Sequence, residues 1–154
     1  MPRLHLETLV LADRERCFEL ALSVDAHTAS MGRSGERAVA GRTQGVLGPG
    51  ETVTWQARHF GLPFRMTVQV TEHRPPEEFV DEQVRGPFGH WSHRHTFTEA
   101  VGGGTRVVDE IDFASPLGAL GRLVDRLVLE RYLRRLVAAR NAWLKETLEA
   151  SPTR

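Results

Sequence analysis

The chain has 154 residues, of which 40% are hydrophobic and 26% are charged, as expected for one globular domain with a single core. Its 20 basic residues balance its 20 acidic residues, so no overall charge attracts nucleic acid or an anionic membrane. The single cysteine, Cys17, excludes an internal disulfide, and no apolar run reaches the ~20 residues of a membrane span. We therefore expect a cytoplasmic protein with one domain over residues 1–150 and a disordered tail over residues 151–154, and neither nucleic acid nor the membrane interior as a partner.

The first two thirds of the chain predict a strand, two short helices and then a series of strands. A strand over residues 4–11 leads to Asp13, which we expect to cap a short helix that includes Cys17. A second short helix or an irregular connection follows before Glu36. Turns that contain glycine or proline then separate strand segments, which we place at residues 37–46, 52–60, 64–71, 79–85, 91–98 and 105–113.

The most informative stretch is EFVDEQVRGPFGHWSHRHTFTE, residues 78–99, whose pattern predicts a β-hairpin. Its centre holds two glycines and a proline, which suit a turn and not the middle of a strand. A turn about Phe88 pairs residues whose numbers sum to 176. The expected pairs are Phe79 with Phe97, Asp81 with His95, Gln83 with His93, and Arg85 with Trp91.

These eight side chains share one face of the sheet because side chains alternate along a strand. The face is aromatic at both ends and polar between them, so we interpret it as the wall of a cavity for an amphipathic molecule. A three-residue turn at Gly102–Gly104 would add Asp109 opposite Phe97 and Ile111 opposite His95, whereas a two-residue turn would place them on the other face. Alternation on the neighbouring strands adds further candidate ligand-binding residues, namely Trp55, His59, Phe64, Met66 and Val68.

The C-terminal part predicts one long helix, or two helices joined by a bend. Ser115 and Pro116 are typical of a helix start. Two apolar stripes follow that are rotated relative to each other, so we expect a bend near residues 130–132. The first stripe is Leu120, Val124, Leu127 and Val128, and the second is Leu133, Leu136, Val137, Leu144 and Leu148. A solvated helix face is expected for the basic cluster of Arg131, Arg134, Arg135 and Arg140.

The order of these elements, together with FVDEQVRGPFGHWSHRHTF, GGGTRVVDEIDF and ASPLGALGRLVDRLV, resembles the START/Bet v 1-like superfamily, also called SRPBCC. The likeness is strongest to bacterial ligand-binding members that are polyketide-cyclase-like. It implies an α+β helix-grip fold, in which a curved antiparallel sheet of six or seven strands wraps round a long C-terminal helix. Members bind lipids, sterols, quinones or polyketides, and some catalyse cyclisation or dehydration. No catalytic signature of the superfamily matches this chain.

Asp81 and His95 have three interpretations: an acid–base pair, a pair that hydrogen-bonds a ligand, and a buried pair that only fixes the sheet register. His90, His93 and His95 invite a metal site, but their spacing is not that of structural zinc, and we expect neither a metal nor a cofactor. We therefore expect a protein that binds a small hydrophobic or aromatic molecule, as a monomer or a homodimer. The alternatives are a cyclase or dehydratase that uses Asp81 and His95, and an interaction module with a vestigial cavity.

Overall fold

The computed structural model describes residues 2–150, apart from the side chain of Arg33, and the expected tail at residues 151–154 lies outside them. One seven-stranded antiparallel sheet has the order β1-β7-β6-β5-β4-β3-β2. The strands are β1 (Arg3–Val10), β2 (Arg37–Gly41), β3 (Thr52–His59), β4 (Leu62–Arg74), β5 (Glu78–Arg85), β6 (His90–Glu99) and β7 (Thr105–Ala114).

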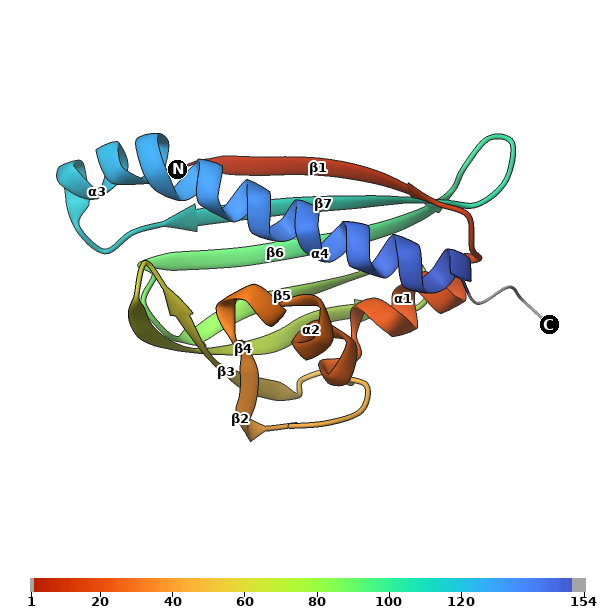
Figure 1. Cartoon of the computed structure of the whole chain (residues 1–154), viewed down its shortest axis with the longest axis horizontal. Helices are drawn as coiled ribbons and strands as arrows, with labels where there is room; N and C mark the ends of the chain where they lie inside the picture. Colours follow the sequence, from red (N-terminus) through yellow and green to blue (C-terminus); the bar gives the residue numbers. More distant parts are fainter. Residues whose placement is uncertain (1, 151–154) are drawn as a thin grey trace.

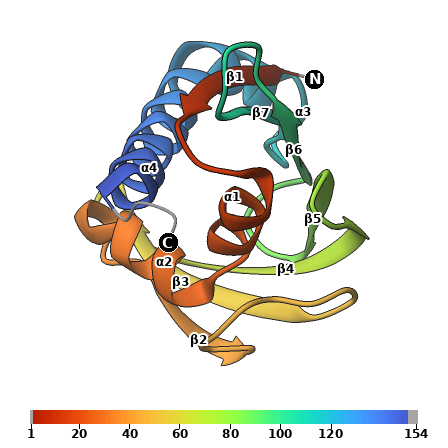
Figure 2. The ribbon, with the colours of Figure 1, turned by 90° about the vertical axis from the view of Figure 1, so that its right-hand side faces the viewer.

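A long helix lies across the concave face of this sheet (Figure 1). Figure 2 shows the sheet curling from β1 round to β2, with α4 along the open side and the short helices near one end. The helical elements are α1 (Arg14–Ala21), α2 (Val24–Ser30), the 3-10 turn η1 (Gly32–Ser34), α3 (Gly118–Val124), the π-helical turn η2 (Asp125–Leu129) and α4 (Glu130–Ala150). The expected α+β helix-grip architecture is confirmed.

The register of the β5–β6 hairpin differs from the expected one by two residues. Phe79 pairs with His95, and Asp81 pairs with His93, so partner numbers sum to 174 and not 176. The ladder ends at Glu82, because the side chain of Gln83 bonds both backbone groups of Phe88 and holds the turn. A shift of two residues leaves every side chain on its expected face, whereas a shift of one would have reversed them all.

The β6–β7 pairing is likewise displaced by two residues. Asp109 lies opposite His95 and Ile111 opposite His93, where Phe97 and His95 had been expected. The connection after Glu99 has five residues, and its three glycines all adopt positive φ. Asp109 therefore points to the inner face, which the sequence alone had left open.

The N-terminal cap forms as expected, since the backbone N–H of Arg16 donates to the Asp13 carboxylate at 2.9 Å. The expected cap at Ser115 is wrong. Helix α3 begins at Gly118, and the nearby Asp125 carboxylate instead accepts the backbone N–H of Ser115 at 3.0 Å. Asp125 is also the first residue of the π turn η2. The wider turn rotates the second apolar stripe relative to the first, just before the position of the expected bend.

The two stripes of the C-terminal helix have different surroundings. The second stripe packs inward as expected, with Leu133, Val137, Leu144 and Leu148 buried. The first does not, because Leu120, Leu127 and Val128 are 66%, 60% and 45% exposed. This end of the helix projects beyond the sheet, so it has no apolar surface to pack against (Figure 1).

The main core lies between α1 and the middle of the sheet. Phe18 makes edge-to-face contacts with Phe79 and Phe97, at 5.6 Å between ring centroids in each case, and Phe97 is 1% exposed. A smaller cluster, centred on Ile111 and Phe113, packs beneath the first turns of α4. The two clusters seal opposite ends of the concave face and leave its middle free.

Removing the central ring tests this description of the core. Phe97→Ala deletes a fully buried ring and should lower the free energy of unfolding by about 3–5 kcal/mol in urea titration. Phe60→Ala is the matched control, because Phe60 is 59% exposed and its loss should cost about 1 kcal/mol or less. Equal losses in the two variants would contradict the assignment of Phe97 to the core.

Candidate functional site

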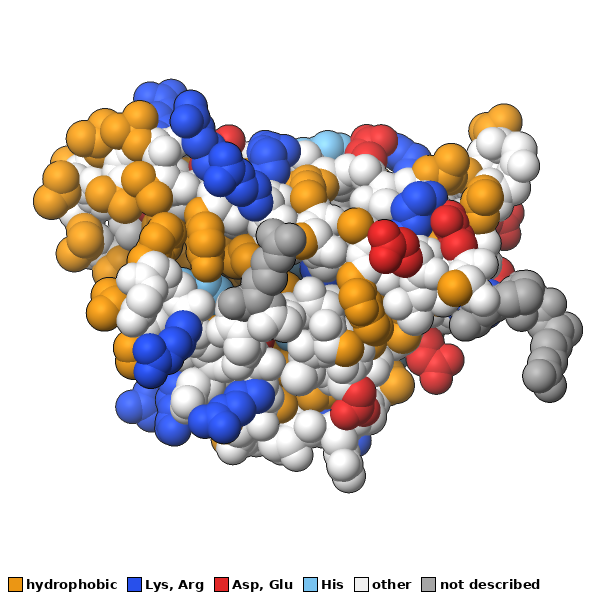
Figure 3. Space-filling view, in the orientation of Figure 1, with side chains coloured by type: hydrophobic (Ala, Val, Ile, Leu, Met, Phe, Trp, Pro, Cys, Tyr) orange, Lys and Arg blue, Asp and Glu red, His pale blue; other side chains and the backbone are white. Residues whose placement is uncertain are grey.

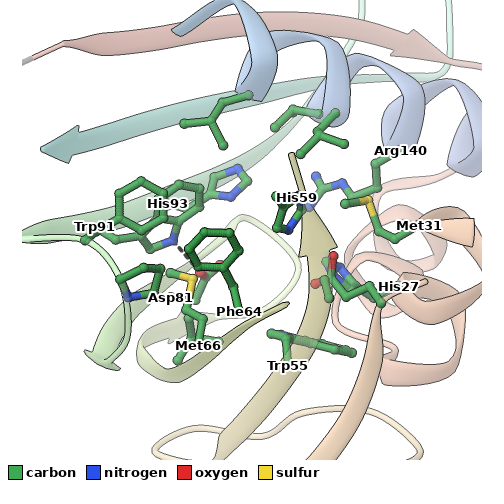
Figure 4. A pocket seen from close by; sticks show the side chains of 18 of the residues that line it. His27, Met31, Trp55, His59, Phe64, Met66, Asp81, Trp91, His93 and Arg140 are labelled. Carbon is green, nitrogen blue, oxygen red and sulfur yellow. Dashed lines mark hydrogen bonds and ion pairs between the residues drawn. The ribbon is translucent and has the colours of Figure 1, made fainter. Parts of the chain in front are cut away.

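A cavity of about 510 Å³ occupies the middle of the concave face, between the sheet, α2 and the C-terminal helix (Figure 4). Its size is that of an ordinary small-molecule site. Most of its wall is apolar, and polar side chains gather at two places in it. One group comes from β5 and β6, and the other from α2, β3, α4 and the residue just before β2.

The structure places ten of the fifteen candidate residues on the cavity wall. They come from β3, β4, β5 and β6, as the alternation of side chains requires. The ten are Trp55, His59, Phe64, Met66, Val68, Phe79, Asp81, Trp91, His93 and His95.

The other five candidates lie away from the cavity surface, each for a physical reason. Phe97 and Ile111 are buried in the two core clusters. Asp109 is fully buried behind the histidines of β6. The Gln83 side chain is engaged by the hairpin turn, and Arg85 lies exposed beyond the last β5–β6 ladder pair.

Asp81 is the acceptor at the centre of the first polar group. The expected contact with His95 is present, with Nε2 2.8 Å from one carboxylate oxygen, and Trp91 Nε1 approaches the other at 3.4 Å. Burial alone would raise the pKa of Asp81, but the hydrogen bond from His95, together with the electrostatic influence of both histidines and the contact with Trp91, outweighs it and holds the pKa below its usual value. Asp81 is therefore an anion, with its side chain 18% exposed, in a mainly apolar cavity.

His93 is neutral at physiological pH. Burial, reinforced by the electrostatic influence of the neighbouring His95, lowers the pKa of His93 to about 4. Its Nε2 lies 2.7 Å from an oxygen of Asp109, which as a carboxylate can only accept, so Nε2 carries the proton. The ring is then left with Nδ1 as a hydrogen-bond acceptor.

Asp109 connects this wall to the long helix. Arg140 Nη2 donates to it at 2.9 Å and Asn141 Nδ2 at 2.6 Å, in addition to the contact with His93. His95 Nδ1 lies 3.2 Å from the same carboxylate, but without the alignment of a hydrogen bond. Burial would raise the pKa of Asp109, yet the Arg140 guanidinium and the histidine contacts hold it well below its usual range.

One group of side chains in the described residues has the composition of a metal site. Asp81, His93 and His95 each offer a ligand atom, and these atoms lie within 4.8 Å of one another. The two imidazoles stack, however, with centroids 3.6 Å apart and planes 24° apart, so their lone pairs cannot converge on one ion. The expectation that no metal binds stays a prediction, and this stacking supports it.

A second polar group lies across the cavity from Asp81, and of its members only His59 had been expected (Figure 4). His59 Nδ1 is 2.5 Å from the hydroxyl of Tyr132, and His27 Nε2 is 2.8 Å from the carboxylate of Glu36. Burial raises the pKa of Tyr132 and lowers that of His59, so both are neutral near pH 7. The ring of His27 also contacts that of Trp55, with the centroids 4.2 Å apart and the planes tilted by 33°.

The sequence contained a usable signal for Arg140 that had been given a different interpretation. Arg140 falls seven residues after Leu133 and four before Leu144, on the buried stripe and not on a solvated face. An arginine in such a stripe needs a buried partner, which Asp109 provides. No local pattern marked His27, Glu36 or Tyr132, because they come together only in the folded chain.

Known structures share this architecture. An aromatase/cyclase, Zhui, from Streptomyces sp. R1128 superposes with a TM-score of 0.76 at 17% identity, over 96% of this chain and 93% of that chain. A protein of Thermus thermophilus gives 0.74 at 20% identity (98% and 100% covered), and a START superfamily protein from Mycobacterium smegmatis gives 0.72 at 12% (96% and 97%). At these identities the likeness shows the fold. No curated protein matches the sequence.

The curved sheet and the long helix are shared with these neighbours, which shows the helix-grip fold. Residues 7–149 match the family described as polyketide cyclase / dehydrase and lipid transport, and the chain belongs to that family. Membership supports a role in ligand binding or cyclisation. Over residues 2–150, none of the helices is both long and apolar enough to cross a membrane.

The neutral state of His93 makes folding stability depend on pH. Its pKa is about 4 in the folded chain and near 6.5 when unfolded, so only the unfolded chain takes up the proton between these values. Stability should be complete above pH 6.5 and fall as the pH approaches 4, by about 3 kcal/mol for this group. Urea unfolding across this range should show a clearly flatter dependence for His93→Gln, whereas His90→Gln, at an exposed position, should keep the wild-type slope. Identical slopes in all three proteins would contradict the assignment.

Proposed function

We propose that this protein binds a small hydrophobic or aromatic molecule in the cavity between the sheet and the C-terminal helix, and that the polar end of the molecule donates a hydrogen bond to Asp81. The observation that carries the proposal is an ionised carboxylate, partly exposed in a cavity whose wall is mostly apolar. A buried anion of this kind is costly unless it is hydrogen-bonded, and a ligand donor would complete its set of partners.

The electrostatics of the wall limit the chemistry of that polar end. Asp81 offers accepting oxygens, and neutral His93 offers an accepting nitrogen. A hydroxyl or phenol therefore suits this wall, whereas a ligand carboxylate would meet the charge of Asp81. Across the cavity, the Tyr132 and His59 pair can take a second polar group of the same ligand. We expect lipid-, quinol- or polyketide-like molecules of this kind, and a cytoplasmic protein that acts as a monomer or homodimer.

A second candidate function is favoured by one further observation. Asp81 and His95 are 2.8 Å apart in the cavity, and His95 lies 3.2 Å from the buried Asp109 on its other side. The ionised Asp81 carboxylate can accept a proton from the carbon next to a carbonyl, which is the first step of a cyclisation or dehydration. A bound 1,3-diketone that exchanged its hydrogens with deuterated solvent faster than the free molecule would favour this enzyme over a simple binding protein.

A matched pair of probes tests the proposed binding function. Naphthol carries a hydroxyl, whereas its methyl ether has a similar shape but no donor. Binding of each can be followed by isothermal titration calorimetry. Asp81→Asn should weaken naphthol binding by about tenfold or more, since a hydrogen bond to a charged group is worth about 1.5–3 kcal/mol, and should leave the ether unchanged.

Two further variants control this experiment. Glu82→Gln removes a neighbouring exposed carboxylate on the outer face and should bind both probes as the wild type does. Met66→Trp adds bulk to the cavity wall and should abolish binding of both. Equal affinity of the wild type for naphthol and its ether would contradict the role of Asp81, and binding that survives Met66→Trp would place the probes outside the cavity.

A further inference from the structure

The projecting end of the C-terminal helix carries an apolar surface that the rest of the described chain leaves largely exposed. We call it the docking rim. It is formed by side chains that are 55–66% exposed, namely Leu117 just before α3, Leu120 and Leu123 on α3 and Leu127 on η2, with Phe60 in the β3–β4 turn and Leu62 at the start of β4. Figure 3 shows these apolar groups gathered over α3 at one end of the molecule. Such a contiguous patch on a monomer is typical of an interaction surface.

The rim is one face of an amphipathic helix. Leu117, Leu120, Leu123 and Leu127 follow one another at intervals of three or four residues, which keeps them on a common face. Gly121 and Asp125, four residues apart, are buried against the body of the protein. Arg122 and Arg126, also four apart, are exposed on a different side. An exposed leucine face beside an arginine face is the pattern of a helix that lies in a membrane interface.

Charge is also distributed unevenly around the rim, although the whole chain is neutral. Residues 115–139 contain five arginines and two carboxylates. Of these carboxylates, Asp125 is 1% exposed and accepts a backbone N–H, and Glu130 pairs with Arg134 at 3.8 Å. Residues 52–71, which cover β3 and most of β4, contain two arginines and no carboxylate. The surface round the rim is therefore positive.

The rim is continuous with the mouth of the cavity. Phe60 and Leu117 belong to the rim and also line the cavity, as do Val124 and Val128 between them and the interior. Phe60 further contacts Tyr132, at 4.5 Å between ring centroids, so the two sides of the mouth meet there. A surface that covered the rim would face the opening through which a hydrophobic ligand passes.

We propose that the docking rim binds the surface of an anionic lipid bilayer. The leucines enter the boundary between headgroups and acyl chains, and the surrounding arginines contact lipid phosphates. The combination of a projecting apolar helix end with flanking arginines favours a bilayer over a second copy of this chain, whose own positive rim would repel it. The ligand then moves between cavity and bilayer without crossing water.

Vesicle co-sedimentation of the full chain tests this inference. The wild type should bind vesicles of mixed phosphatidylcholine and phosphatidylglycerol, and should bind pure phosphatidylcholine weakly, with an affinity that falls as salt is added. Leu120→Ser/Leu123→Ser and Arg122→Ser/Arg126→Ser should each weaken binding by about tenfold or more, because each removes two interfacial contacts. Val101→Ser is the matched control, since Val101 is fully exposed in the distant β6–β7 turn and its loss should change nothing.

Three outcomes would overturn the inference: no wild-type binding to the mixed vesicles, equal binding by the rim variants and the wild type, or a wild-type dimer that Leu120→Ser/Leu123→Ser converts to monomer. Thermal unfolding checks that the variants are folded, which is expected because the changed side chains are exposed. Binding of naphthol to the same variants separates this inference from the proposed function. If a protein binds naphthol but the wild type does not bind vesicles, only the inference about the docking rim is refuted, and the proposed binding function stands.

Discussion

The interaction on which the rest of this structure depends is the set of hydrogen bonds around Asp109. Its carboxylate is fully buried, and it accepts from Arg140 and Asn141 on α4 and from His93 on β6. A buried charge is stable only when each of its lone pairs has a partner, so sheet and helix must meet in one relative position. Removing a partner would leave the charge uncompensated, which is more costly than losing one ordinary contact.

This constraint also sets the chemistry of the cavity. Because Asp109 can only accept, it fixes the proton of His93 on Nε2, while burial keeps the ring neutral. His95 lies between Asp109 and Asp81, so it links the buried carboxylate to the one that faces the cavity. The structural carboxylate and the functional carboxylate are thus different residues joined by histidines. This arrangement lets Asp81 remain charged where a ligand can reach it.

The sequence was sufficient for the fold and for the inner face of the hairpin, and the reasons are physical. Alternation has a period of two, so an error of two in the pairing of Asp81 and Asp109 left both on the correct side. The length of a turn decides the register of the strands that it joins. The β5–β6 turn is held by the Gln83 side chain, and the β6–β7 connection has five residues, three of them glycines; no local pattern specifies either length. Ten of the fifteen candidate residues line the cavity because their side chains were predicted on the correct face of the sheet. The other five do not, because they lie too deep in the core or near the end of a strand.

Long-range partners were beyond the sequence. Arg140 was placed among solvated arginines, although it lies on the apolar stripe and pairs with Asp109, thirty-one residues away. Leu120, Leu127 and Val128 form part of a predicted apolar stripe, but hydrophobic spacing indicates a helix face and does not say what covers it. Neutral composition likewise concealed a positive surface at one end of the molecule. In each case the sequence did not show which helices and strands contact each other in the folded chain.

The central claim is that the cavity holds a small molecule whose polar end meets Asp81, and native mass spectrometry of protein purified from its own host tests it most directly. We expect an additional mass on the wild type that is lost on denaturation, is absent from Met66→Trp, and fragments as a largely apolar molecule bearing a hydroxyl. Wild-type protein that carries no small molecule, or a bound species that Met66→Trp retains equally, would contradict the claim.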